Sequence, residues 1–493
     1  MDRFKRRNLE SFSLLLIIIT TVVSLIEISL LINLNIRIFL FIFFTFIGIA
    51  LIILNFSIGF FYILTYIFLM PFLRRFILIY EKYEPIELLY LVPDILTLFL
   101  FTYLFILKIQ EFKKLLSYTE FKILFFLQVL MFIQIFNPIQ GSLYAGFGGT
   151  KFLLIPSLFS YFAYMIENSN FRRIRNFIIF AGLASLVYSY FQLKSKFFFF
   201  ERNWILIVSS EYKQVLEMLS GNIRPFSFFS SISEFGQFMG ISAIVSLFFI
   251  KNKLKYLLTF LFITGIIISG VRSSIYAFLI CSLFLIFFKR SNNLKDFIKF
   301  SIISIVCFTI IVSAIDIPST YGTKTYVGRF LQGVFDPLRE GSSVYPRLET
   351  WKKVIIHVFT KNPFGAGLGV ATRASVRLGG IPAMHDSTFF GMFSACGIVG
   401  GFLLIYLVLS IIFKSINSTA DIKETVKFPL ILILFISIGQ LLTQYLIGAL
   451  FWGSIGMWIR GFYFYKHGKY KDNHYETKDN SWGKPLKGNQ HKL

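Results

Sequence analysis

Long apolar runs recur along almost the whole chain, and each is long enough to cross the hydrocarbon core of a bilayer. A helix needs about 20 predominantly apolar residues to span that core, which is about 30 Å thick. Short alternating segments, which would indicate a transmembrane barrel, do not occur in the sequence. The runs therefore predict an all-α polytopic membrane protein with about fourteen spans, near residues 11–33, 36–55, 57–79, 86–107, 121–136, 151–166, 177–195, 236–250, 255–270, 273–288, 298–315, 387–412, 428–447 and 449–465.

The composition agrees with this class. Hydrophobic residues make up 56% of the 493 residues and charged residues 15%. A soluble protein usually carries about 25% charged residues to cover its surface. The mean hydropathy of +0.71 points the same way, so most of the chain is expected to lie in lipid or against other apolar helices.

The net charge of +24 would suit a nucleic-acid binder, but its distribution indicates membrane topology instead. With the N-terminal MDRFKRR inside the cell, the loops KIQEFKK, NFRRIRN, KNKLK, KRSNNLKDFIK and KSINSTADIKETVK all fall on the cytoplasmic side. This is the pattern of the positive-inside rule, and we expect no nucleic-acid partner. Arg74 and Arg75 are the exception, because the same assignment places them near the outer face.

This topology divides the chain into four parts. Residues 1–315 form a transmembrane bundle of about eleven spans, and residues 316–386 form a long extracytoplasmic loop. Residues 387–465 add the C-terminal transmembrane helices, and residues 466–493 form a cytoplasmic tail.

Basic side chains also occur on the predicted outer side, where topology does not require them. Any one of them could be a snorkelling side chain or a contact to a lipid headgroup. Several on one face favour an anionic ligand bound from outside, because guanidinium groups make bidentate, charge-assisted contacts with phosphate. These residues are Lys151, Arg224, Arg272, Arg329, Arg339, Arg347, Arg373 and Arg377.

The long outer loop contains a second pattern. Apolar residues recur at helical spacing within VYPRLETWKKVIIHVFTKNPF and predict an amphipathic helix that ends at Asn362-Pro363. This helix would either lie at the membrane interface or pack over the bundle. The segment FGAGLGV (364–370) then predicts a glycine-rich turn that lets backbone approach a ligand or another helix. The apolar stripe consists of Val344, Leu348, Trp351, Val354, Ile355 and Val358.

The loop closes with a histidine and an aspartate directly before the apolar segment that begins near residue 387. His385 is one of five histidines in the chain, and Asp386 follows it. A histidine can act as a base near neutral pH, whereas its alternative role is that of an interfacial residue at a helix start. No cluster in the sequence has metal-ligand spacing, and the three cysteines have unrelated spacings. We therefore expect chemistry without a metal or cofactor.

Four stretches follow one another along the chain: FNPIQGSLYAGFGGTKFLL, RPFSFFSSISEFGQF, SGVRSS, and RLETWKKVIIHVFTKNPFGAGLG with HDSTFFGMFSACGIVGGFLLIY. In this order they resemble the O-antigen polymerase and O-antigen ligase superfamily of membrane glycosyltransferases. FNPIQGSLYAGFGGTKFLL resembles a segment in which the family often has an arginine; Lys151 stands in that place here. RPFSFFSSISEFGQF and SGVRSS resemble the family's arginine-containing entries to two spans. RLETWKKVIIHVFTKNPFGAGLG, followed by HDSTFFGMFSACGIVGGFLLIY, resembles its loop helix, glycine turn and histidine doublet. The matches cover roughly residues 90–412.

The resemblance implies a GT-C-like fold and the transfer of an oligosaccharide from undecaprenyl pyrophosphate to an acceptor hydroxyl outside the bacterial cytoplasmic membrane. Arg224, Arg272 and Arg347 would hold the pyrophosphate, and His385 would orient or deprotonate the acceptor. Asp386 would either cap the following helix or fix the histidine tautomer. Further contacts to the pyrophosphate or glycan would come from Lys151, Arg329 and Arg373.

Within the superfamily, the sequence leaves a choice of activities. We favour a polymerase of O-antigen or capsular repeat units, with a ligase that transfers polysaccharide to lipid A-core as the alternative. A flippase or transporter of lipid-linked oligosaccharide is the alternative from another class, which would predict two similar halves and charges in the middle of spans. The expected partners are the lipid-linked oligosaccharide, membrane lipids, a chain-length regulator and a flippase.

Overall fold

The computed structural model describes residues 35–80, 87–166, 170–195, 197–212, 218–219, 222–290, 345–371, 378–380, 387–417, 424–439 and 444–466. The predicted spans 11–33 and 298–315, the first part of the loop 316–386 and the tail beyond residue 466 lie outside these residues.

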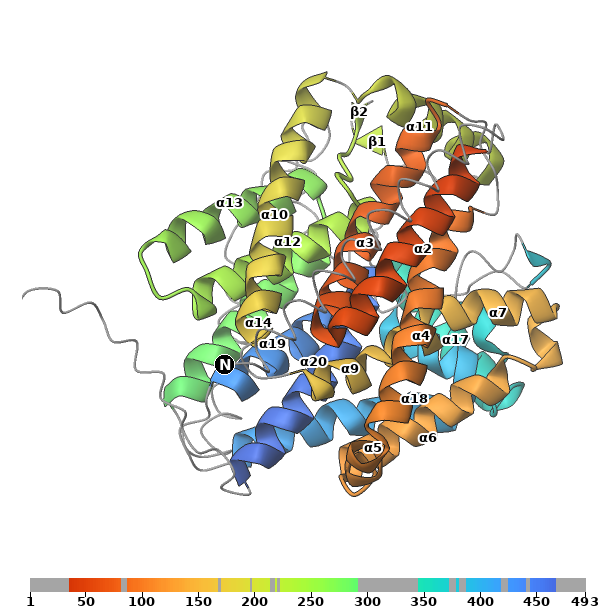
Figure 1. Ribbon diagram of the computed structural model, residues 1–493, viewed down its shortest axis with the longest axis vertical. Coiled ribbons are helices and arrows are strands. Elements are labelled where there is room, and N and C mark those ends of the chain that lie inside the picture. The colour runs from red at the N-terminus through yellow and green to blue at the C-terminus, as the bar shows by residue number, and fades with distance from the viewer. Residues whose placement is uncertain are drawn as a thin grey trace, which may run out of the picture.

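The described part of the chain is helical apart from one short antiparallel hairpin, in which β1 (Met218–Leu219) pairs with β2 (Asn222–Ile223). Figure 1 shows this hairpin and α11 together at one edge of the helical bundle, with α5 at the opposite edge. The helices are α2 (Ile36–Leu54), α3 (Phe56–Ile77), η1 (Leu88–Leu91), α4 (Val92–Leu107), α5 (Ile109–Leu115), α6 (Thr119–Gln134), η2 (Pro138–Gln140), α7 (Leu143–Phe152), α8 (Leu154–Ser157), α9 (Phe159–Met165), α10 (Asn170–Ser195), α11 (Phe199–Tyr212), α12 (Ile232–Phe249), α13 (Leu254–Ser269), α14 (Arg272–Arg290), α17 (Tyr345–Thr360), η4 (Leu368–Ala371), α18 (Thr388–Asn417), α19 (Glu424–Gly439) and α20 (Tyr445–Lys466).

Among the described residues, six helical segments are long and apolar enough to cross a membrane. A seventh would be the pair α5 and α6, which is bent by 103° between its two parts. The helical membrane class predicted from the sequence is therefore supported, whereas the total of about fourteen spans stays a prediction. The six segments are Ile36–Leu54, Phe56–Ile77, Leu88–Leu107, Phe171–Lys194, Ile232–Phe249 and Thr388–Asn417.

Two predicted spans are each divided between separate helices. The predicted span 151–166 is broken into the end of α7 and the short helices α8 and α9. Pro156 explains the first break, because its ring clashes with the carbonyl four residues earlier, at Phe152, where α7 ends. The predicted span 428–447 is likewise wrong as a single helix, since α19 ends at Gly439 and α20 begins at Tyr445.

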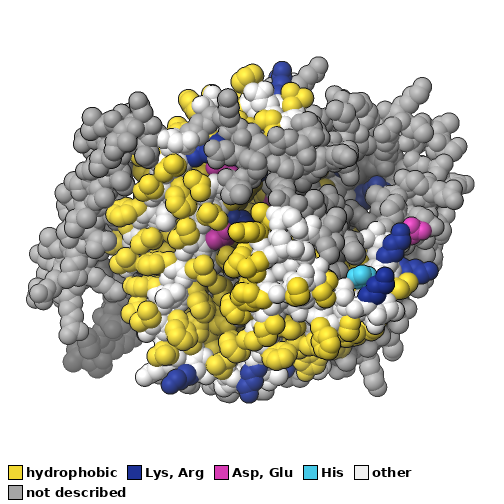
Figure 2. All heavy atoms as spheres, turned by 90° about the vertical axis from the view of Figure 1, so that its right-hand side faces the viewer, with side chains coloured by type: hydrophobic (Ala, Val, Ile, Leu, Met, Phe, Trp, Pro, Cys, Tyr) yellow, Lys and Arg dark blue, Asp and Glu magenta, His cyan; other side chains and the backbone are white. Residues whose placement is uncertain are grey.

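The two ends of the bundle differ in how they hold basic residues. At one end, which we call the exposed basic end, the start of α10 meets the end of α12 through an Arg175–Phe249 carbonyl bond of 2.9 Å. The end of α4 meets the start of α3 there through Lys108, 4.6 Å from the Phe56 ring centroid. Lys and Arg side chains also border the apolar surface at the lower margin of Figure 2. The exposed residues of this end are Lys113, Lys114, Lys122, Arg172, Arg173, Lys251 and Lys253.

At the opposite end, basic residues are buried. We call it the buried basic end and define it by Arg37, Arg74, Arg75 and Arg224, each of which is almost inaccessible to solvent. Burying a charged side chain costs free energy unless it is paired or hydrogen-bonded. Four buried arginines at one end of the bundle therefore indicate a functional region.

The glycine-rich segment 364–370 packs against a break in α18. Gly397, inside that helix, has φ 68° and ψ −165°, which interrupts the helical hydrogen bonds. The backbone N–H groups of Ala366 and Gly367 donate to the carbonyls of Ser394 and Ala395, at 2.8 and 3.2 Å. Of the two alternatives for the glycine turn, the structure therefore shows close approach to another helix.

The same break is closed from its other side. The Ile398 N–H donates to the Pro363 carbonyl at 2.9 Å. Side chains at the end of α6 complete the junction, since Gln134 donates to the Phe364 carbonyl at 2.6 Å and Asn137 to the Gly365 carbonyl at 3.0 Å. Irregular backbone at membrane depth is tolerated where protein satisfies it in this way.

The predicted amphipathic helix is confirmed as α17, which ends just before Asn362-Pro363. Val354 and Val358 are buried, and Trp351 stacks on Phe390 of α18 with ring centroids 5.0 Å apart. Ile355 is exposed, although the sequence pattern places it on the same stripe. The helix thus packs on α18 and leaves one apolar edge uncovered by the described residues.

Replacing Gly397 with alanine is expected to destabilise the protein measurably. A Cβ there would collide with the Pro363 carbonyl oxygen, and a backbone with φ 68° and ψ −165°, which essentially only glycine adopts, costs about 1–3 kcal/mol for other residues. The midpoint of thermal unfolding in detergent should fall. Gly453→Ala is the matched control, because its nearest neighbour, the Ala163 Cβ, would lie 3.8 Å away. Equal midpoints for both variants would contradict the role assigned to Gly397.

Candidate functional site

The structure describes some of the predicted site residues and not others. Lys151 lies in α7, Arg272 begins α14, and Arg224 lies in the segment between β2 and α12. Arg347 is placed by its backbone in the first turn of α17. The other predicted site residues lie outside the described residues: His385, Asp386, Arg329 and Arg373. The roles assigned to all eight residues stay predictions.

The turn between α13 and α14 carries one predicted arginine, Arg272, and binds a second, Arg224. Gly270 ends α13 in the left-handed conformation, with φ 67°, and its N–H donates to the Ile266 carbonyl at 3.0 Å. Arg272 then begins α14. Arg224 is buried and donates from Nη1 to the Ser269 carbonyl at 3.1 Å. Arg224 is thereby fixed to a carbonyl only three residues from Arg272 along the chain.

The start of α12 lies against this turn. A Cβ on Gly236 would come within 2.6 Å of the Val271 Cβ, so only glycine permits the observed approach. The first turns of α12 therefore belong to the same region as Arg224 and Arg272.

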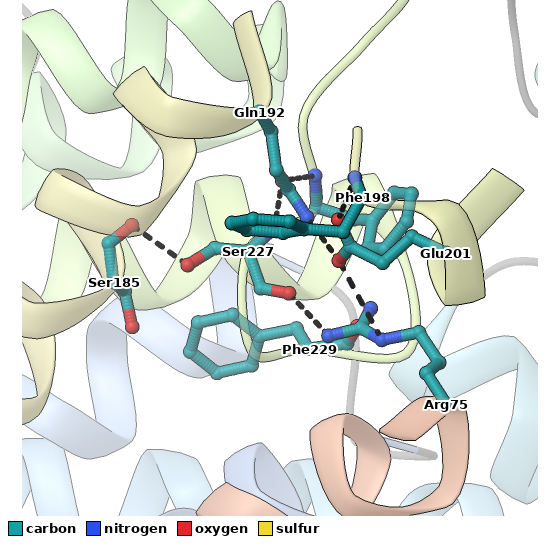
Figure 3. A network of polar contacts seen from close by, with 8 residues as sticks. Arg75, Ser185, Gln192, Phe198, Glu201, Ser227 and Phe229 are labelled. Atoms are coloured by element: carbon teal, nitrogen blue, oxygen red, sulfur yellow. Dashed lines mark hydrogen bonds and ion pairs between the residues drawn. The ribbon is translucent and has the colours of Figure 1, made fainter. Parts of the chain in front are cut away.

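Arg75 forms the centre of a second group of contacts, drawn in Figure 3. Its guanidinium donates to the Phe229 carbonyl at 2.9 Å and to the Ser227 carbonyl, and its Nε lies 3.9 Å from Glu201. It also faces the Phe226 ring at 4.6 Å from the centroid. Arginine can make these three contacts at once because its planar guanidinium group carries several N–H donors in fixed directions. The single ammonium group of lysine cannot reproduce them.

Gln192 of α10 joins this group to the backbone before α12. Its Oε1 accepts from the N–H groups of Phe226 and Ser227, at 3.1 and 2.8 Å, while its Nε2 donates to Glu201 at 2.7 Å. Ser227 has φ 53°, uncommon for a residue other than glycine, and its Oγ donates to the Ser185 carbonyl at 2.7 Å. A strained backbone held by several partners is typical of functional regions.

Lys151 belongs to a third group. Its ammonium donates to Asp94 Oδ2 at 2.9 Å and to the Tyr90 carbonyl. Tyr445 donates its hydroxyl to Asp94 Oδ1 at 2.8 Å. Arg74 donates to the Tyr90 hydroxyl at 3.2 Å, with the guanidinium 5.0 Å from the ring centroid. Lys151 and Arg74 therefore share one tyrosine.

A site of this kind suits an anion. Several basic groups are removed from water, where Coulomb interactions are stronger than in solution. Their positions are fixed by hydrogen bonds before any ligand arrives, which is the arrangement that stabilises developing negative charge. In the described part of the chain, no three His, Cys, Asp or Glu side chains come together in a group able to hold a metal ion.

The structure adds residues that the sequence did not single out as site residues. In the sequence, Arg74 and Arg75 stand out only as exceptions to the topology, and Asp94, Glu201 and Glu234 belong to no motif described above. The available signal was the isolated acidic residue within an apolar stretch, as in LVPDIL, FFFFERNW and SISEFG. Charges in such places are rare and more often functional.

Comparison with known proteins gives no further guide to identity. No protein family, curated protein or solved structure matches the chain. The fold and site define a helical membrane protein with buried basic groups at one end of its bundle, and this arrangement carries the functional argument.

Proposed function

We propose that the protein is an extracytoplasmic glycosyltransferase that polymerises oligosaccharide repeat units carried on a polyprenyl pyrophosphate. The observation that carries the proposal is the buried basic end, where Arg74, Arg75 and Arg224 are buried. The half-buried Lys151 lies beside Arg74 on the same tyrosine, Tyr90. Held in place away from water, these groups suit a pyrophosphate at a membrane surface.

The pyrophosphate is the leaving group in this reaction, so negative charge grows on it in the transition state. Arginines that already point at it stabilise that charge without reorganising. We assign this role to Arg224 and Arg272 at the α13–α14 turn and to Arg347 in α17. In this proposal His385 orients or deprotonates the acceptor hydroxyl.

The proposal places the buried basic end outside the cytoplasm. The exposed basic end carries the Lys and Arg residues that the positive-inside rule assigns to the cytoplasmic face, which leaves the other end for chemistry with an exported donor.

The exposed apolar side chains on α7 support a lipid-linked donor. Tyr144 and Phe147 are exposed and lie two turns and one turn before Lys151 on the same helix. A polyprenyl chain in the bilayer could lie along this face while its headgroup reaches the basic residues.

The test is polymerisation by the purified full-length chain in liposomes that contain the lipid-linked repeat unit. We expect a ladder of polymer lengths without added ATP or an ion gradient, because the pyrophosphate ester drives the transfer. Movement of the donor across the bilayer without any ladder would favour a transporter. A product that appears only when lipid A-core is added, in a single transfer, would favour a ligase.

A further inference from the structure

A buried carboxyl group lies at the start of α12, within the region of the basic residues. Glu234 is 4% exposed. Its Oε2 accepts hydrogen bonds from the N–H and the hydroxyl of Ser230, at 3.3 and 2.8 Å. Ser231 caps the helix by accepting from the Glu234 N–H at 3.1 Å. Glu234 Oε1 accepts no hydrogen bond from the described residues.

Glu234 differs from the other buried acidic residues in its lack of a basic partner. Glu87 pairs with Arg37 at 3.3 Å, and Asp94 pairs with Lys151 at 2.9 Å. No Lys or Arg of the described part of the chain lies within ion-pair distance of Glu234. The helix start offsets only part of the cost of burying a carboxylate, so this group is costly to keep.

A second buried polar group accompanies Glu234 one turn further along α12. Gln237 is completely buried, yet neither its Nε2 nor its Oε1 has a hydrogen-bond partner in the described structure. Its amide lies against Gly439 at the end of α19. Buried amides are nearly always satisfied, and an unsatisfied one calls for an explanation such as a catalytic role.

These groups are linked through neighbouring residues to the basic residues described above. Ser230 follows Phe229, whose carbonyl accepts from Arg75. The Ser230 hydroxyl also lies 3.5 Å from Gln444, which precedes the Tyr445 that binds Asp94. Glu234 is thus connected by adjacent residues to the Arg75 contacts and to the Lys151 contacts. Gly236 touches the turn that carries Arg272, as shown above.

We propose that Glu234 is the base of the transfer reaction and that Gln237 hydrogen-bonds the acceptor sugar beside it. In this step the acceptor oxygen forms a bond to C1 of the donor sugar while its proton passes to Glu234. The bond from C1 to the phosphate oxygen breaks, and its electron pair leaves with the polyprenyl pyrophosphate. His385 then orients the acceptor and does not take the proton. This inference rests on the proposed function.

The structural alternative is that Glu234 only stabilises the start of α12, where its carboxylate accepts from Ser230 while Ser231 caps the helix as in a capping box. A capping box accepts glutamine as well as glutamate at this position, so Glu234→Gln should retain the cap and remove the base. Ser231→Ala is the matched control, because it removes the cap and leaves the carboxyl group in place.

The experiment measures donor binding and transfer kinetics for the wild-type protein, Glu234→Gln, Ser231→Ala and Gln237→Leu in liposomes. We expect Glu234→Gln to bind the donor normally and to transfer about 10²–10⁴-fold more slowly, the usual contribution of a general base. Ser231→Ala should transfer at close to the wild-type rate. Gln237→Leu should raise the acceptor KM more than it lowers kcat.

A second variant guards against a folding defect. Glu234→Ala leaves a cavity that formate can enter, and added formate should raise its transfer rate at least about tenfold by replacing the missing base. Glu234→Gln has no such cavity and should not respond.

The results separate this inference from the proposed function. An active wild-type protein with near-normal transfer by Glu234→Gln, or with no formate rescue of Glu234→Ala, overturns the role of Glu234 alone. Equal large losses of transfer in Glu234→Gln and Ser231→Ala would show that the reaction needs an intact start of α12 and not the Glu234 carboxyl group in particular, which overturns the role of Glu234 as well. A wild-type protein that forms no polymer overturns the proposed function, and the inference with it.

Discussion

Replacing Arg272 with lysine is expected to abolish polymer formation while the protein still inserts and binds its lipid donor. Lysine keeps the positive charge but loses the planar fork that contacts two phosphate oxygens at once. Loss of one fixed donor in a charge-stabilising site typically lowers the rate about 10²–10³-fold. The α13–α14 turn is fixed by Gly270 and by the Arg224–Ser269 bond, so the backbone at residue 272 is rigid. Backbone movement therefore cannot compensate for the shorter side chain of lysine.

The assay is the polymer ladder in liposomes, with donor binding measured in the same preparation. Arg173→Lys is the matched control, because Arg173 is exposed at the other end of the bundle and should tolerate the change. Arg272→Ala should be at least as inactive as Arg272→Lys. Full activity in both Arg272 variants would remove this residue from the site and leave Arg224 as the only predicted arginine at that turn.

The helices themselves were predictable because a bilayer imposes a simple rule on the sequence. A run of apolar residues of sufficient length must form a helix that satisfies its own backbone, so α2, α3, α10, α12 and α18 follow from hydropathy alone. The glycine turn at 364–370 and the end of α17 also followed from local residue types.

The breaks were less predictable, because their signals compete with hydropathy. Pro156 marks the interruption after α7, but the segment around it is apolar enough to resemble one span. Gly397 interrupts α18 only because the backbone of residues 363–367 is present to bind the freed groups. That partner is about 30 residues away in sequence, and periodicity along one helix does not identify it.

The buried polar contacts were the least predictable part. Hydropathy indicates which residues avoid water but does not show which helices meet. Arg75 contacts Glu201 and the carbonyl of Phe229, which are more than 100 residues away in the chain. The sequence could show that a lone charge near a span needs a partner, without showing which residue provides it.

Replacing Arg75 with leucine is expected to have the largest effect on folding. Arg75 is 1% exposed, and its loss would leave Glu201 buried without its cation and two carbonyls without their donor. Removing one partner of a buried ion pair typically costs about 3–5 kcal/mol. We expect little folded Arg75→Leu protein in the membrane and a much lower midpoint of thermal unfolding in detergent.

Glu201→Gln should be milder, since Arg75 retains the Ser227 and Phe229 carbonyls and glutamine can still bond to Gln192. The double variant Arg75→Leu/Glu201→Gln should recover part of the stability lost in Arg75→Leu, because no uncompensated charge remains. Coupling between contacting residues is usually about 0.5–3 kcal/mol. Arg173→Leu, at the exposed basic end, controls for loss of an arginine as such. If the losses of stability in Arg75→Leu and Glu201→Gln simply add in the double variant, the Arg75–Glu201 pair at 3.9 Å contributes no coupling. The two carbonyl bonds of Arg75 must then account for the loss of stability in Arg75→Leu.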